Sequence, residues 1–354
     1  MQPWLEVAAG GNPHSRHRAG WRAAEAVEAA IGEVATLVGA WPGEVVLTSG
    51  ATEANDLALF GASRPGGRVL ASAIEHPSVL EALPALADAH RQTVVLPVDR
   101  TGRLRFGALG PLGEGDLVTV IAASNEIGTL QDLARLAGDC RAAGALFHTD
   151  ASQLLASEGV DVHALGIDLL SLSAHKLYGP QGIGALVVRD GISLEPRLRG
   201  GGQQGGRRAG TVPVALAVGL GVASRLAREQ READRARLAA LRDRLWDGLQ
   251  AGWRGIVRNG SCAHGLAGCL HVSLPGIDAE DLLLDVPEIC ASTGSACASG
   301  QAGPSHVLQA IGLDPGAAHG SLRFGLGRFT TEPEIDFTIA RIASALAAPA
   351  RALA

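Results

Sequence analysis

Lys176 is the residue whose setting most strongly suggests chemistry. It lies directly after an apolar run, in the segment SLSAHKLYGP at 171–180. Lysine is rarely buried without a partner. An amine that is desolvated by burial loses its proton more easily and can then form a Schiff base with a carbonyl compound. A surface lysine in a loop is the alternative interpretation.

Cys297 is the second candidate, because small residues flank it on both sides in the segment STGSACASG at 292–300. Such a segment predicts an accessible, mobile loop. The remaining cysteines are expected to be small buried hydrophobic residues, the usual state of the side chain: Cys140, Cys262, Cys269 and Cys290. The cysteine spacing matches no common zinc pattern, so no metal site is expected.

A Gly-Ala-Thr turn at 50–52 falls between an apolar run and a helical pattern. Small residues let backbone N–H groups approach a phosphate, and the N-terminus of a helix favours its negative charge. Thr52 could equally cap the helix in a plain tight turn.

Asp150 follows another apolar run. A carboxylate there can pair with the protonated pyridine nitrogen of pyridoxal phosphate, or it can simply cap the end of a strand. Further polar residues also come just after apolar runs: His76, Asn125, Gln153, Ser173 and His175.

Short apolar runs alternate with longer helical patterns through most of the chain, and these elements would position the candidate residues. Strands are predicted at 45–48, 68–72, 93–97, 117–123, 145–149, 168–172 and 184–188, with helical patterns at 53–60 and 133–143. This order indicates an α/β fold with a mostly parallel sheet covered on both faces. Ligands bind beyond the carboxyl ends of such strands, so the candidate side chains should converge on one crevice.

A long helical pattern at 214–250 precedes a C-terminal part with strand patterns at 270–274, 289–292 and 321–325. Thr331 and Glu334 form a capping box before the last helix, whose apolar stripe is Ile335, Ile339, Ile342 and Leu346. We therefore expect a large domain over 1–212, a linking helix over 213–250 and a small α+β domain over 251–354.

The bulk properties exclude several classes of protein. The 354 residues are 47% hydrophobic and 19% charged, which is typical of a globular enzyme. The net charge of −6 argues against nucleic acid as the main partner. The first residues show no secretory signal, and the apolar run at 211–224 is too short to span a membrane. Five scattered cysteines form no disulfide framework, so a cytoplasmic location is expected.

Several segments together resemble the cysteine desulfurases, a class V aminotransferase branch of the fold-type I pyridoxal-phosphate enzymes. The resemblance covers nearly the whole chain, from GNPHS at 11–15 to GRF at 327–329. Its motifs occur in order: TSGATE (48–53), EHPSV (75–79), NEIGT (125–129), HTDA (148–151), the lysine segment, RRAGT (207–211), the cysteine segment and LRF (322–324). It implies a large domain with a mostly parallel seven-stranded sheet and a small α+β C-terminal domain.

The resemblance also implies how the cofactor would be held. Lys176 would carry pyridoxal phosphate covalently, and Asp150 would pair with its pyridine nitrogen. His76 would stack on the ring and assist proton transfers, while Gln153 would bond the phenolic oxygen. The phosphate would be held by three residues of one subunit and by one from the neighbouring subunit of a homodimer: Thr52, Ser173, His175 and, from the neighbour, Thr211.

For the reaction, the resemblance implies that Asn125 and Arg323 bind the carboxylate of L-cysteine. Cys297 would then take the sulfur as a persulfide, with L-alanine as the other product. The stretch from Cys297 through PSHVL at 304–308 resembles the branch with an extended, mobile cysteine loop. Members of that branch hand sulfur to iron–sulfur scaffold or thiolation partners.

Two features depart from the family pattern. Only residues 1–10 precede GNPHS, where the family usually has a strand and an Ala-Thr-Thr segment lining the active site. Val212-Pro213 follows Thr211, where the family usually has an acidic or apolar residue and then Asn. Two alternatives therefore stay open. One is a related pyridoxal-phosphate enzyme that acts on selenocysteine or cysteine sulfinate or performs transamination, and the other is a silenced homologue that acts as a binding partner.

Overall fold

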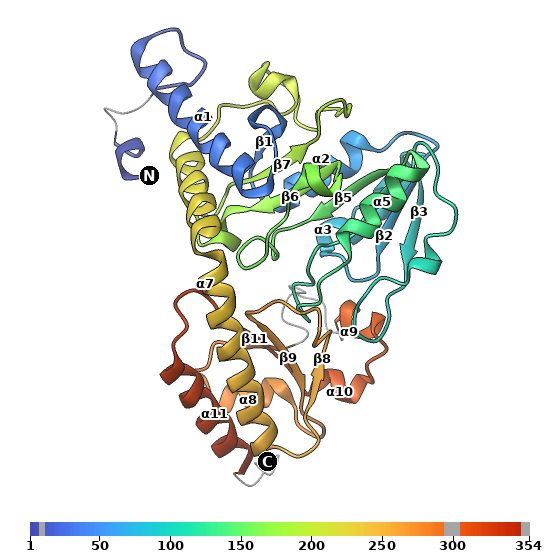
Figure 1. The fold of residues 1–354 in the computed structure, drawn as a ribbon, viewed down its shortest axis with the longest axis vertical. Helices are drawn as coiled ribbons and strands as arrows, with labels where there is room; N and C mark the ends of the chain where they lie inside the picture. The colour runs from blue at the N-terminus through green and yellow to red at the C-terminus, as the bar shows by residue number, and fades with distance from the viewer. Residues whose placement is uncertain (7–10, 294–304, 348–354) are drawn as a thin grey trace. The chain divides into compact units, whose positions relative to one another are not determined.

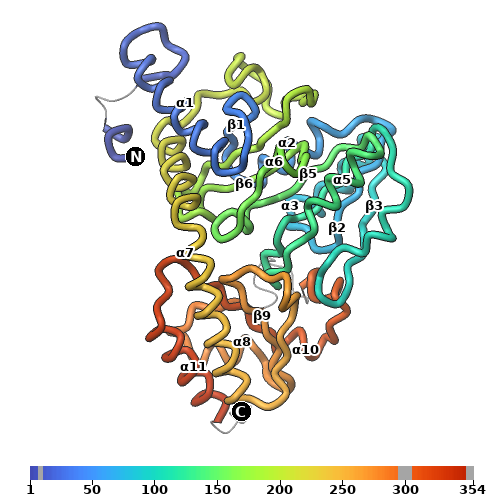
Figure 2. Tube along the Cα trace, viewed as in Figure 1, coloured from blue at the N-terminus to red at the C-terminus, as the bar shows by residue number. Residues whose placement is uncertain are grey.

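The computed structural model describes residues 1–6, 11–293 and 305–347 (Figure 1). The chain forms two compact units. The large unit comprises Met1–Leu96, Arg105–Ala123 and Gln131–Arg231, and the small unit comprises Pro97–Leu104, Ser124–Leu130 and Glu232–Ala354. The division falls within the longest helix, α7 (Val214–Gly252). In Figure 2 the colour of the tube gives the residue number, so the reader can follow the chain through Pro97–Leu104 and Ser124–Leu130, the two segments from the N-terminal half that belong to the small unit.

A seven-stranded sheet forms the centre of the large unit, in the order β1-β7-β6-β5-β4-β2-β3. Only β7 runs antiparallel to its neighbours, so the mostly parallel seven-stranded sheet is confirmed. The strands are β1 (Val45–Thr48), β2 (Arg68–Ser72), β3 (Gln92–Leu96), β4 (Leu117–Thr119), β5 (Leu146–Asp150), β6 (Leu169–Ser173) and β7 (Gly184–Val188). Each lies within about a residue of its prediction except β4, which ends four residues earlier.

Helices cover this sheet in the large unit. The helix α2 (Ala51–Ala62) packs against β1, β5, β6 and β7, and its apolar residues enter a core that includes Val46, Leu57 and Leu186. The helix α5 (Leu133–Ala143) packs on β5, as its predicted range requires. The remaining α-helices are α1 (Arg18–Val38), α3 (Pro77–Leu80), α4 (Leu83–Asp88) and α6 (Val162–Leu165).

Local chemistry accounts for the ends of α5. Asp132 accepts a hydrogen bond from the backbone N–H of Arg135 at 3.1 Å, which caps the N-terminus. Gly144 then ends the helix with φ +73°, a conformation that a residue with a Cβ rarely adopts.

The small unit contains a second sheet, in the order β10-β11-β9-β8, in which every pair is antiparallel. Its strands are β8 (Val257–Asn259), β9 (Cys269–Ser273), β10 (Ser292–Thr293) and β11 (Ser321–Gly325). One face packs apolar side chains such as Leu270, Val272 and Leu322 against α8 (Ala279–Asp285) and α11 (Glu332–Ala347). The short helices α9 (His306–Ala310) and α10 (Pro315–His319) complete the unit.

The last helix begins as its capping box predicts. The carboxylate of Glu334 accepts hydrogen bonds from the backbone N–H and the hydroxyl of Thr331, at 2.8 and 2.9 Å. Ile335 and Ile342 are buried, so the predicted apolar stripe faces the core. Among the described residues, no helix is both long and apolar enough to cross a membrane.

Candidate functional site

One edge of the large sheet gathers most of the candidate residues. The strands β1, β2, β5 and β6 all run in the same direction, so their carboxyl ends lie at the same edge. Directly after these ends come Thr52, His76, Gln153, His175 and Lys176, while Asp150 and Ser173 are the last residues of β5 and β6. The convergence expected from the sequence is thus present in the large unit.

The turn before α2 leaves a helix N-terminus without a side-chain cap. Gly50 is the N-cap residue, with φ +156°, and its backbone lies against Gly184 at the start of β7. A Cβ on Gly184 would come within 2.8 Å of the Gly50 backbone, so a glycine is needed for this close approach. Thr52 is exposed in the first turn of the helix. Because free N–H groups and the helix dipole favour an anion, the turn suits a phosphate.

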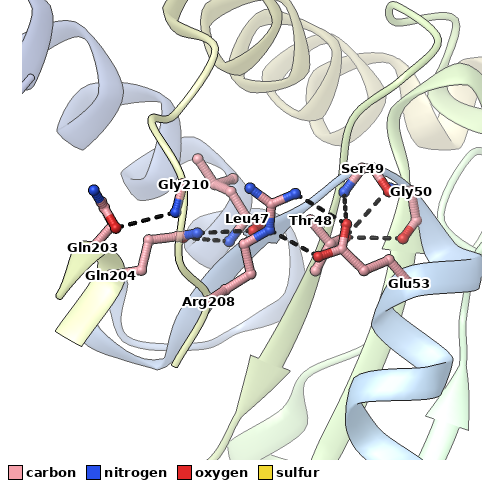
Figure 3. A network of polar contacts seen from close by, with 9 residues as sticks. All are labelled: Leu47, Thr48, Ser49, Gly50, Glu53, Gln203, Gln204, Arg208 and Gly210. Carbon is pink, nitrogen blue, oxygen red and sulfur yellow. Dashed lines mark hydrogen bonds and ion pairs between the residues drawn. The ribbon is translucent and has the colours of Figure 1, made fainter. Parts of the chain in front are cut away.

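A second loop is fastened to this turn, as Figure 3 shows. The side-chain amide of Gln204 accepts a hydrogen bond from the Leu47 N–H at 2.7 Å and donates one to the Leu47 carbonyl at 2.9 Å. Arg208 pairs with Glu53, whose carboxylate also accepts from the Ser49 N–H at 2.6 Å. The ion pair therefore attaches the end of the loop to the first turn of α2. The exposed Thr211 comes three residues after Arg208.

Asp150 is held as a hydrogen-bond acceptor at the end of β5. It is only 4% exposed, and its Oδ1 accepts from the Ser152 N–H at 2.9 Å. Its Oδ2 accepts from the side-chain amide of Asn55 at 2.8 Å. An ionised carboxylate has about four lone-pair sites, so these two bonds leave it able to accept from a protonated ring nitrogen.

His76 is connected to Asp150 through two residues that the sequence analysis missed. Its Nδ1 lies 2.8 Å from the hydroxyl of Ser78 and accepts from the Ser78 N–H at 3.1 Å. The Ser78 hydroxyl in turn accepts from the amide of Asn55 at 2.9 Å. Asn55 is a buried residue inside a helix, and Ser78 has no assigned role in the EHPSV segment, so only the fold shows that the two residues connect the site.

Two buried titratable groups lie near Asp150. Burial lowers the pKa of His148 to about 4, and the neutral ring bridges Thr119 on β4 and Ser171 on β6, at 2.8 and 2.9 Å. Burial, reinforced by the charge of Asp150, raises the pKa of Glu75 to about 8, although bonds from Ser72 and the Ile121 N–H oppose the shift. Both groups are therefore largely uncharged at neutral pH.

The lysine segment follows β6 as a 3-10 turn, η5 (Ala174–Leu177). Ser173 is 3% exposed, and its hydroxyl lies 2.8 Å from Nδ1 of His175. Burial, together with the nearby charge of Lys176, lowers the pKa of His175. The expectation that Lys176 is desolvated is wrong for the single chain, because the turn exposes its side chain.

Asn125 and Arg323 are brought together in the small unit. Nη1 of Arg323 donates to the backbone carbonyl of Asn125 at 3.0 Å, and Nη2 donates to the Ser292 hydroxyl at 3.2 Å. The segment that carries Asn125 is attached to this unit by backbone bonds of Gly128 and Leu130. These bonds fix the direction of the guanidinium on β11.

Arg323 belongs to a polar row that crosses the small sheet. The strand register places Ser292, Arg323, His271 and Asn259 beside one another on four successive strands. Nδ1 of His271 lies 3.0 Å from the amide nitrogen of Asn259. Burial and the charge of Arg323 lower the pKa of His271 to about 3, so this neighbour of the arginine stays neutral.

The cysteine predictions are partly wrong. Cys140 is buried, and burial raises its pKa to about 12, as expected of a small core residue. Cys262 and Cys290 are exposed, because each lies in a loop beside a short strand. Cys297 lies outside the described residues. Within the described part of the chain, no group of three or more His, Cys, Asp or Glu side chains could hold a metal ion.

Comparison with known proteins identifies the family. The sequence profile of the class-V aminotransferases matches residues 4–337. The chain belongs to this family. A curated cysteine desulfurase, IscS of Klebsiella pneumoniae (strain 342), is 43% identical over 338 residues, which cover 93% of this chain and 83% of that protein. The resemblance to the cysteine desulfurases is therefore confirmed.

Solved structures of family members agree. A NifS-like protein superposes with a TM-score of 0.90 at 30% identity, covering 98% of this chain and 93% of that one. The structure of SspA in complex with cysteine superposes with a TM-score of 0.80 at 32% identity, covering 93% and 94%. The fold of type I pyridoxal-phosphate enzymes is thus confirmed.

Pyridoxal phosphate is the cofactor of this family. The described residues fit it: an uncapped helix N-terminus for its phosphate, a carboxylate with acceptor capacity for its ring nitrogen, and a lysine at the same edge of the sheet.

Proposed function

We propose that this family member is a cysteine desulfurase that converts L-cysteine to L-alanine and keeps the sulfur as a persulfide on Cys297. Its motifs and its relatives favour this activity over the other class V reactions and over a silenced homologue. The observation that supports it most is Asp150, a buried carboxylate held by Asn55 and Ser152 at the edge that also carries Lys176.

The large unit would hold the cofactor at this edge. Lys176 would bind it covalently, Asp150 would accept a hydrogen bond from its ring nitrogen, and Gln153 would bond its phenolic oxygen. Its phosphate would lie at the N-terminus of α2, bound by Thr52, Ser173, His175 and the partner subunit's Thr211. When bound, pyridoxal phosphate accepts the electrons released as the α-proton of the substrate leaves.

Asp150 would make the bound ring a better electron acceptor, because an anionic partner would favour a protonated ring nitrogen. Asn55 and Ser152 each donate a hydrogen bond to its carboxylate and hold it in place. Because Glu75 is largely protonated at neutral pH, it adds little competing negative charge. His76 would stack on the cofactor ring and carry protons to and from the substrate.

The substrate carboxylate would bind to Arg323 and Asn125. A guanidinium can donate two parallel hydrogen bonds to a carboxylate, which fixes orientation as well as position. The bonds of Arg323 to Ser292 and to the Asn125 carbonyl hold that group in place. Substrate binding would thus depend on a row of side chains that the small sheet aligns.

Cys297 would act as a thiolate on the sulfur of the bound substrate. A sulfur–sulfur bond forms as the carbon–sulfur bond breaks, and protonation of the carbon yields L-alanine. The persulfide on Cys297 is then passed to an acceptor of the iron–sulfur scaffold or thiolation type.

A cytoplasmic homodimer would be the active form of the enzyme. The exposed Trp21 and Val222, on α1 and α7 of the large unit, are compatible with a subunit interface.

The proposal is tested by incubating the purified protein with L-cysteine and measuring L-alanine and protein-bound sulfur. Equal amounts are expected in the first turnover. Faster turnover of selenocysteine, cysteine sulfinate or an amino-group acceptor, unaffected by Cys297→Ala, would identify another class V reaction. Light scattering tests the dimer separately.

A further inference from the structure

A chain of four polar groups runs from β5 across α2 to the start of α3. Asp150 Oδ2 lies 2.8 Å from Asn55 Nδ2, which lies 2.9 Å from the Ser78 hydroxyl. That hydroxyl lies 2.8 Å from Nδ1 of His76. The chain joins the residue proposed to face the cofactor nitrogen with the residue proposed to move protons.

The direction of each bond follows from the chemistry of the groups. An ionised carboxylate only accepts, so the amide of Asn55 must turn its NH₂ group, and not its oxygen, toward Asp150. The same NH₂ group donates to the Ser78 oxygen, so the single hydrogen of that hydroxyl is left to donate to His76. Nδ1 of His76 also accepts from the Ser78 N–H at 3.1 Å. A neutral His76 therefore carries its proton on Nε2.

The environment of the Asn55 side-chain oxygen indicates that the hydrogen bonds to Asp150 and Ser78 matter. Asn55 is fully buried, and its Oδ1 has no hydrogen-bond partner in the part of the chain that the structure describes. A buried acceptor without a partner is unfavourable, and leucine would fill similar space without it. The amide thus gives two hydrogen bonds to the site and receives none in return.

We infer that Asn55 is a positioning residue that couples Asp150 to His76 through Ser78 and holds His76 in the Nε2–H form. The inference rests on the proposed function for the roles of Asp150 and His76. Asn55 touches neither reacting atoms nor cofactor in this scheme. It keeps the carboxylate supplied with a donor and leaves Nε2 as the nitrogen that exchanges protons.

Two variants cut the chain at different links. Asn55→Leu removes both amide bonds, whereas Ser78→Ala removes only the link to His76 and leaves the bond to Asp150. Asp56→Asn is the matched control, since Asp56 is the next residue of α2 and pairs with Arg197 on the exposed side. Thermal melting of each full-length variant checks that it is folded.

The first readout needs no cofactor and no turnover. Nitrogen NMR of the full-length, histidine-labelled protein, at a pH above the usual histidine titration range, reports which nitrogen carries the proton, and His76→Gln assigns the signal among the 11 histidines. The wild type and Asp56→Asn should show a protonated Nε2 and a bare Nδ1. Because the Ser78 backbone N–H still donates to Nδ1 in both variants, Asn55→Leu and Ser78→Ala should raise the share of the ring that is protonated on Nδ1 without making it the main form. A proton on Nδ1 in the wild type overturns the inference, even if a variant does not fold.

The second readout separates the two links in the loaded enzyme. Asn55→Leu should weaken pyridoxal-phosphate binding by about tenfold and shift the pH dependence of its absorption, because Asp150 loses a charge-assisted donor. Ser78→Ala should leave binding within about twofold and lower kcat more than it raises KM. Unchanged binding, spectrum and His76 signal in a folded Asn55→Leu variant would refute the coupling. A failure of desulfuration itself would leave the NMR result intact and would count against the proposed function alone.

Discussion

Arg208 and Glu53 form an ion pair, 2.8 Å from Nε to Oε1, in which both side chains are less than one-fifth exposed. The pair fastens the loop that carries Thr211 to the helix turn that carries Thr52. Thr52 and Thr211 are both proposed phosphate ligands, Thr52 in its own subunit and Thr211 in the neighbouring one. The ion pair therefore sets the position of a phosphate ligand in each of two sites.

We expect Arg208→Met to lower the free energy of unfolding by about 1–3 kcal/mol, because it leaves the mostly buried Glu53 carboxylate without its cation. Cofactor binding should weaken as well. The double variant Arg208→Met/Glu53→Gln should recover much of the stability, since no lone charge remains. Denaturant unfolding of the wild type and the two variants measures this, and a double variant no more stable than the single one would contradict it.

Glu75 predicts how stability depends on pH. Its pKa is about 8 in the folded chain and 4.5 ordinarily, so the folded state holds a proton that the unfolded state loses. The contribution of Glu75 to the free energy of unfolding is complete below pH 4.5 and is lost as pH rises through 8. Between these two values the free energy of unfolding falls by about 1.4 kcal/mol per pH unit. Glu75→Gln, which keeps the acceptor for Ser72 and Ile121, should flatten this slope. An unchanged slope in denaturant unfolding would show that another group is responsible.

The thiols should differ in reactivity. Cys262 and Cys290 are exposed, whereas burial raises the pKa of Cys140 to about 12 and of Cys269 to about 11. Iodoacetamide should therefore label Cys262 and Cys290 and spare the other two, as peptide mass mapping would show. The Cys262→Ser/Cys290→Ser variant should retain desulfuration. Loss of activity in that variant would indicate that one of the exposed loop thiols takes part.

Arg323→Lys should raise KM for L-cysteine by about tenfold or more with a smaller effect on kcat, because an ammonium cannot replace a two-point contact with the carboxylate. Arg341→Lys is the control, since Arg341 pairs with Glu288 on the surface. Steady-state kinetics separates the two parameters. Equal effects of both substitutions would remove Arg323 from the substrate site.

The sequence predicts the large sheet well, because buried parallel strands are short apolar runs with helices between them. It misses β8, which is three residues long and includes the half-exposed Val257. The polar row of the small sheet could not be predicted either. Strand register, and not sequence spacing, places Asn259 and His271 beside Arg323.

The site residues divide in a similar way. Candidates at or just after strand ends, such as Asp150 and Lys176, could be proposed from the sequence because topology brings strand ends together. Asn55 and Ser78 are missed because the partners of Asn55, which are Asp150 and Ser78, lie 95 and 23 residues away from it along the chain. The exposure of Lys176 also goes against expectation, since the end of a buried strand does not determine which way the next turn faces.

Intact-mass analysis after treatment with L-cysteine tests the central claim most directly. The wild-type chain should gain the mass of one sulfur atom, mapped to the peptide that contains Cys297, and borohydride should trap the cofactor on the peptide that contains Lys176. Cys297→Ala should still trap the cofactor and gain no sulfur. Sulfur on another cysteine, or full transfer by Cys297→Ala, would contradict the account.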